Sequence, residues 1–165
     1  MSAASGAQAP RSYTLAQIAL HWSIAALVIW QLVFGESMQA LEHPEGASAT
    51  DTFLANSHLV VGFAVLALVA VRIVLRLVNG APPPEESSRA AAILARAAHA
   101  AFYLLLVAVP VTGILAFYFG LPTGELHELG KPAFIVLIAL HVAATAWHQF
   151  VRHDGTLRRM LVPAR

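Results

Sequence analysis

Cysteine is absent from this 165-residue chain, and charged residues make up only 12% of it. Without cysteine there can be no disulfide framework and no covalent haem attachment through a C-x-x-C-H motif. The scarcity of charge excludes an ordinary soluble domain, because 58% of the residues are hydrophobic and that composition is typical of chains surrounded by lipid. The composition therefore predicts a membrane-embedded protein.

Four apolar runs are each long enough to cross a hydrocarbon core, which takes about 20 residues of helix. We expect helices at about 15–35, 54–78, 97–120 and 132–151. Lipid offers no partner to unpaired backbone groups, so these segments should be helical. The predicted fold is all-α, a membrane four-helix bundle in which residues 1–165 form a single transmembrane domain. The first run is too long for a cleaved signal peptide and is expected to remain as an anchor.

Basic residues are distributed unevenly between the ends and connections of the chain. Nine of the ten lie at the N-terminus, around the second connection or at the C-terminus, whereas the first and third connections hold Lys131 and six carboxylates. The positive-inside rule then predicts that both termini are cytoplasmic. We expect a multi-pass protein of a bacterial inner membrane.

Four histidines, His21, His58, His141 and His148, fall within the expected membrane helices. Ionisable residues at membrane depth are costly, and each one is a candidate functional residue. A lone histidine there is more often a helix-to-helix hydrogen bond than a ligand, but four histidines at matched depths favour ligation. His141 and His148 share one helix face about 10.5 Å apart along the axis.

Depth below the membrane boundary suggests how these histidines pair. At 1.5 Å per residue, His21 and His148 lie ~9 Å and ~6 Å from the inner boundary, while His58 and His141 lie ~6 Å and ~13 Å from the outer one. We therefore predict an inner pair, His21 with His148, and an outer pair, His58 with His141, although the outer depths match less well. Zinc and copper usually recruit a third or fourth ligand, whereas haem iron needs only two axial ligands. The prediction is two non-covalent haems b with these four histidines as metal ligands.

Other polar residues near the expected helix ends each have two possible roles. Arg72 and Arg76 could bind haem propionates as part of the cofactor site, or they could be snorkelling arginines. His99 could contact a propionate or a quinone or relay a proton, or it could be a plain interfacial residue. His127 and Glu128 could serve quinone protonation, although the reading as solvated loop residues is favoured.

Several of these residues recur together in a known pattern. They are His21-Trp22, His58 with Gly62, Arg72 with Arg76, His99 followed by Tyr103, Pro110-Val-Thr-Gly113, His127-Glu128, and His141 with His148. Over about residues 11–160 this pattern resembles the prokaryotic four-helix cytochrome b561 proteins, which are related to the cytochrome b subunits of membrane hydrogenases. The resemblance implies two non-covalent haems b, four histidine ligands from helices one, two and four, and exchange of electrons with the quinone pool. Gln149, where some relatives repeat histidine, and the acidic first outer loop depart from the pattern.

The sequence thus predicts a membrane di-haem cytochrome b that transfers single electrons between the quinone pool, with ubiquinone as the candidate quinone, and a periplasmic or membrane partner at one face. Membrane lipid is an expected partner, and nucleic acid is not. One alternative is a superoxide:quinone oxidoreductase, an activity reported within the resembling family. The outer connections carry a formal charge of −5 from one lysine and six carboxylates, which would repel an anionic substrate. The other alternative is a haem-free metal carrier or an anchoring subunit.

Overall fold

A computed structural model describes residues 12–41, 46–83 and 89–163 of the protein. The four long helices are α1 (Leu15–Phe34), α3 (Ala49–Asn79), α4 (Arg89–Phe119) and α6 (Gly130–Trp147). Shorter elements are α2 (Ser37–Ala40), α5 (Gly124–Glu128), a π-helix η1 (His148–Arg152) and a 3₁₀ helix η2 (Arg158–Met160). Four helical stretches are long and apolar enough to cross a membrane. The prediction of an all-α membrane four-helix bundle is confirmed.

The second and third long helices begin earlier than the apolar runs indicated. Helix α3 begins at Ala49 rather than near residue 54, because Ser48 and Asp51 form a reciprocal capping box at its start. Such a box satisfies backbone N–H groups that have no partner within the helix. Helix α4 begins at Arg89 rather than near residue 97. His58 is therefore nine residues into its helix instead of about four.

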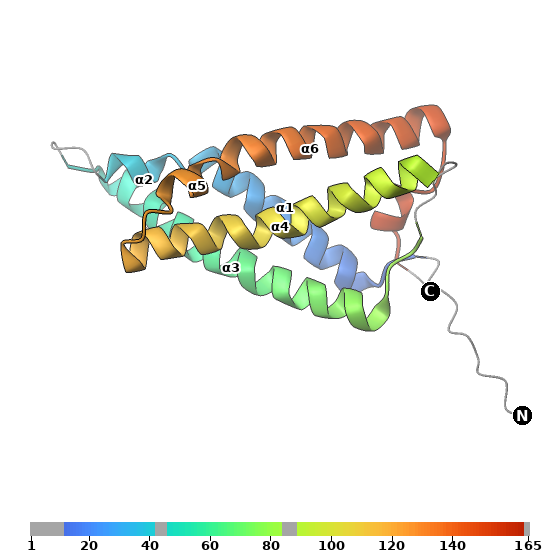
Figure 1. Cartoon of the computed structure of the whole chain (residues 1–165), viewed down its shortest axis with the longest axis horizontal. Coiled ribbons are helices and arrows are strands. Elements are labelled where there is room, and N and C mark those ends of the chain that lie inside the picture. Colours follow the sequence, from blue (N-terminus) through green and yellow to red (C-terminus); the bar gives the residue numbers. More distant parts are fainter. Residues whose placement is uncertain (1–11, 42–45, 84–88, 164–165) are drawn as a thin grey trace, which may run out of the picture.

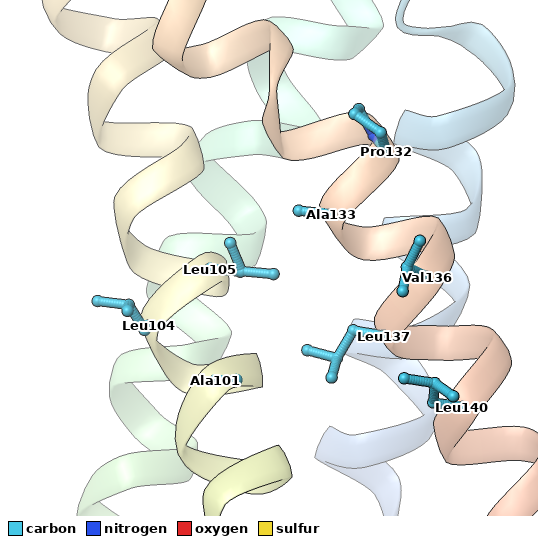
Figure 2. Close-up of a pocket in the computed structure, with 8 residues that line it drawn as sticks. All are labelled: Ala101, Leu104, Leu105, Pro132, Ala133, Val136, Leu137 and Leu140. Carbon is cyan, nitrogen blue, oxygen red and sulfur yellow. The ribbon is translucent and has the colours of Figure 1, made fainter.

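The helices pack in a chain of neighbours rather than all against all. Helix α1 packs along α3, α3 against α4, and α4 against α6, whereas α1 and α6 pack little against each other in the described part of the chain (Figure 1). The core is small and consists of Ile24, Val28, Val65, Val69, Leu106 and Phe134. Many large apolar side chains face outward, such as Leu77, which is 79% exposed. That surface is what a lipid environment would cover.

The two ends of the bundle differ in their short elements. Helices α2 and α5 lie at one end, and the end of α3 and the start of α4 lie at the other (Figure 1). The chain that follows α6 returns to this second end, where the Ser12 hydroxyl donates a hydrogen bond to the carbonyl oxygen of Val162 at 3.0 Å. The beginning and the end of the described chain therefore meet on the same side of the bundle.

Candidate functional site

One group of histidines lies in the half of the bundle nearer the chain ends. The ring centroids of His21 on α1 and His141 on α6 are 6.5 Å apart, and those of His99 on α4 and His141 are 6.0 Å apart. Phe102 packs edge-on against His141 at 5.3 Å. Imidazoles from the first and last membrane helices thus face each other where these helices have little direct packing.

We call His21, His99 and His141 the inner group. Arg72 adds a positive charge beside it. One terminal nitrogen of its guanidinium donates to the carbonyl oxygen of Gln17 at 2.7 Å, and the other lies 3.5 Å from Nδ1 of His21. Arg76, one turn later on α3, lies over the Tyr103 ring at 5.7 Å from its centroid. Only Arg72 of these two arginines is recorded in contact with a histidine of the inner group.

A second histidine pair lies at the opposite end of the bundle. The rings of His58 on α3 and His127 on α5 are 5.9 Å apart and nearly perpendicular, at 86°. Nδ1 of His127 donates to the carbonyl oxygen of Val109 at 2.7 Å. A carbonyl oxygen can only accept, so Nδ1 holds the proton, and in the neutral ring Nε2 is the nitrogen with the lone pair. Nδ1 of His58 is buried with no hydrogen-bond partner among the described residues.

The position of His127 is set by helix α4, not by its own neighbours in sequence. A Cβ atom at Gly113 would lie 2.8 Å from the His127 ring, so this ring needs the space that a glycine leaves. Thr123 just before α5 donates its hydroxyl to the carbonyl oxygen of Thr112 at 2.8 Å. The His127 ring therefore packs against the turn of α4 around Pro110 and Gly113.

This packing leads to a prediction for Gly113. In Gly113→Ala the new methyl group should push the His127 ring off Val109, because contacts under 3 Å cannot be accommodated without movement. If the chain binds two haems as the sequence predicts, we expect thermal loss of one haem to become several-fold faster and loss of the other to be unchanged. Gly124→Ala is the matched control, since a Cβ at that glycine would meet nothing within 4 Å. Equal haem retention in the two variants, followed by the Soret absorbance, would contradict this role for Gly113.

His148 has a different setting, at the end of α6. Its Nδ1 donates to Oδ2 of Asp154 at 2.5 Å, and the backbone N–H of Thr156 donates to Oδ1 of the same carboxylate at 3.0 Å. Burial raises the pKa of Asp154, but hydrogen bonds from His148 and Thr156 outweigh this effect and lower the pKa to about 2. The Asp154 carboxylate is thus charged at neutral pH and holds the His148 ring.

The structure does not bring together the pairs that depth predicted. His141 lies beside His21 and His99 rather than His58, His58 lies beside His127, and His148 is bonded to Asp154. The earlier start of α3 does not explain this difference, because it adds about 7.5 Å to the depth of His58 and makes it level with His141; equal depth does not by itself make two side chains face each other. Ligation by His148 is untested by these contacts and stays a prediction.

His127 is the residue whose place in the site the sequence reasoning did not identify. Its surroundings in sequence, including Glu125 and Glu128, indicated a solvated loop. The available signal was spacing: His127 precedes His141 by 14 residues, which is two heptads and keeps two side chains close to one helix face.

Comparisons with known proteins agree with the fold and the histidine pattern. Residues 12–163 match the family described as prokaryotic cytochrome b561. The chain belongs to this family. It is also 35% identical over 156 residues to a protein named cytochrome b562 from Cereibacter sphaeroides, a match that covers 92% of this chain and 96% of that protein. No solved structure matches the chain significantly.

Membership of this family makes the protein a multi-pass membrane cytochrome b that binds haem b and functions in electron transfer. The residues present suit such a cofactor. The His21 ring lies beside His141 and the His58 ring beside His127, with His99 next to the first pair, and the described ranges contain no group of three or more histidine or acidic side chains that could hold a metal ion alone. Haem iron takes four nitrogens from its own ring, so two histidines complete its coordination. The buried, unpaired Nδ1 of His58 shows that this ring is not there to satisfy a hydrogen bond through that atom.

Proposed function

We propose that this cytochrome b holds two haems and transfers single electrons between the quinone pool and a redox partner at one membrane face. The observation that supports this most directly is the presence of two facing pairs of imidazole rings, His21 with His141 and His58 with His127. Each pair offers the two axial ligands of one low-spin haem b. Two haems at two levels of the bundle provide a path for electrons across much of the bilayer.

The ligand set in this proposal contains His127 in place of His148. His127 lies 14 residues before His141, on the separate helix α5, whereas the seven residues from His141 to His148 correspond to only about 10.5 Å of helical rise. Two haems held in one bundle would need separate levels, which the longer spacing provides. The hydrogen bond from His127 to the Val109 carbonyl is the kind of outer contact that orients a ligating imidazole and raises its basicity.

The redox step belongs to the haem iron, and the side chains around it hold and tune the cofactor. Arg72 lies beside His21, where its planar guanidinium can pair with a haem propionate. Arg76 contributes positive charge from its place over Tyr103. These two arginines therefore belong to the inner cofactor-binding site in this proposal, Arg72 more directly than Arg76.

A quinone headgroup is best accommodated near His99. This exposed residue lies 6.0 Å from the His141 ring, and its Nδ1 donates to the Ala95 carbonyl oxygen at 2.7 Å. Nε2 of the neutral ring then accepts, which suits the hydroxyl group of a hydroquinone such as ubiquinol. We further propose that both termini are cytoplasmic, which puts this group on the inner side of a bacterial inner membrane.

The test is a haem assay combined with a spectroscopic redox titration of the purified protein. We expect two haems per chain, sharp α and β bands on reduction, and two one-electron transitions. A soluble ubiquinol analogue should reduce both haems, and a stoichiometry of one haem would contradict the pairing of all four histidines. Two haems that no quinol reduces, and that no quinone reoxidises, would exclude the quinone pool as partner.

The same preparation separates the alternative functions. Superoxide, generated enzymatically, should reduce the haems slowly, because Lys131, the only basic residue of the outer connections, is already paired with Glu36 and the remaining charge there is negative. Reduction by superoxide at rates near the diffusion limit would instead favour the superoxide:quinone oxidoreductase. Absence of any haem band in correctly inserted protein would favour a metal carrier or an anchoring subunit.

A further inference from the structure

Helices α1 and α6 supply the inner pair of imidazoles but pack little against each other. Contacts at the ends of the helices must therefore help to fix their separation. At the α2 and α5 end, Lys131 forms an ion pair with Glu36, and both side chains are exposed, at 42% and 71%. Exposed pairs of this kind stabilise a structure little, so a stronger link is needed elsewhere.

The chain after α6 provides such a link at the inner end. We call residues 153–163 the C-terminal segment. Nε1 of Trp22 on α1 donates to the carbonyl oxygen of Met160 at 2.9 Å, and the Ser12 hydroxyl donates to that of Val162 at 3.0 Å. Arg159 also donates to the carbonyl oxygen of Pro83, which follows α3, at 2.8 Å. The segment thus contacts α1 directly beside His21.

The other end of the C-terminal segment is fixed to α6 and η1 through His148. The His148 and Asp154 side chains, only 13% and 15% exposed, share the hydrogen bond of 2.5 Å, and the backbone N–H of Asp154 donates to the carbonyl oxygen of His148 at 3.2 Å. His153 between them has a left-handed backbone, with φ of 52°, which reverses the chain direction. Charge-assisted hydrogen bonds at low exposure are stronger than surface ion pairs.

We propose that the C-terminal segment is a positioning element that holds α1 and α6 at the separation required by the inner haem, attached to α6 through Asp154 and to α1 through Trp22. The inference rests on the proposed ligation of that haem by His21 and His141. His148 then acts through Asp154, and neither residue touches the iron. This explains why a nearly buried histidine and carboxylate occur at the end of α6, away from both facing pairs.

Removal of the C-terminal segment tests the proposal first. In a chain that stops after Arg152, the inner haem should dissociate about tenfold faster or be lost, because several hydrogen bonds of ordinary strength disappear together. The ferrous inner haem should also bind carbon monoxide, since a strained axial histidine is displaced easily. The outer haem should be unchanged, and equal effects on both haems would overturn the proposal in favour of a general role in folding.

Full-length variants keep the test independent of truncation. Trp22→Phe removes one hydrogen-bond donor and should speed dissociation of the inner haem several-fold, whereas Trp147→Phe, at a tryptophan that is 58% exposed on α6, should not. Asp154→Ala should have the same effect as Trp22→Phe or a larger one. If both residues act through one segment, their effects will not add, and the double variant should equal the truncated chain. Additive effects, or no effect of Trp22→Phe, would contradict the proposal.

The separation of the helices can be measured without haem. Because the chain has no cysteine, Leu15→Cys and Phe150→Cys, at side chains that are 67% and 73% exposed, give two selective sites for spin labels. The distance distribution between them should be narrow in the full chain and broader after truncation. An unchanged distribution would overturn the positioning role even if the truncated protein lost haem. A protein that binds no haem at all would contradict the proposed function, while this measurement would still test the segment.

Discussion

His127→Ala is expected to lose one of the two haems, and His148→Ala to keep both. The His127 ring lies 5.9 Å from His58, so its removal leaves one iron with a single protein ligand. The His148 ring is held by Asp154 instead, and its loss should only loosen the inner haem. The haem-to-protein ratio should therefore fall by about half in the first variant, as measured by the pyridine haemochrome assay.

Two further variants make this result specific. Added imidazole should restore a six-coordinate low-spin spectrum in His127→Gly, because it can occupy the space of the missing ring. His153→Asn removes another histidine while tolerating the left-handed backbone at that position, and it should keep both haems. If His148→Ala lost a haem and His127→Ala kept two, the pairing predicted from depth would be right and the proposed ligand set wrong.

Double substitutions should show which histidines share an iron. His58→Ala combined with His127→Ala should retain the same single haem as either variant alone, since the second substitution removes a ligand from an iron already lost. His58→Ala combined with His141→Ala should retain none. The depth-based pairing predicts the reverse for the second combination, with one haem left.

The measurement for these double variants is a redox titration beside the haem assay. A protein with one haem gives a single one-electron transition, whose midpoint identifies the surviving site by comparison with the single variants. His21→Ala with His141→Ala is the matched combination for the inner site and should leave the outer transition in place. Membrane insertion of each variant is checked with a label at an introduced cysteine, for example at Leu15, so that failure to fold is recognised.

The four membrane helices could be predicted because their apolar runs are long and contain few charged residues. The start of α3 could not, because its first turns include Thr50, Asp51 and Thr52, which do not belong to an apolar run. The capping box between Ser48 and Asp51 was the local signal for it. A shift of five residues is about 7.5 Å along a helix, which makes His58 level with the depth expected for His141, so depth alone could not decide which histidines face each other.

The role of His127 could not be read from its neighbourhood for a different reason. The His127 ring packs against Val109 and Gly113 of another helix. Contacts between segments that are distant in the sequence depend on how the helices pack and not on the local sequence pattern. Four of the histidines could be identified as candidate haem ligands from their expected depth in the membrane and from their number. Their partners depended on the arrangement of α1, α3, α5 and α6 in space.

The two imidazole pairs also differ in when they can form during synthesis. His58 and His127 come from α3 and α5, so both precede α6 in the sequence. His21 and His141 join α1 and α6, and the C-terminal segment that links these helices follows α6 in the sequence. Since chains emerge from the N-terminus onward, both residues of the outer pair are synthesised before the residues that complete the inner site.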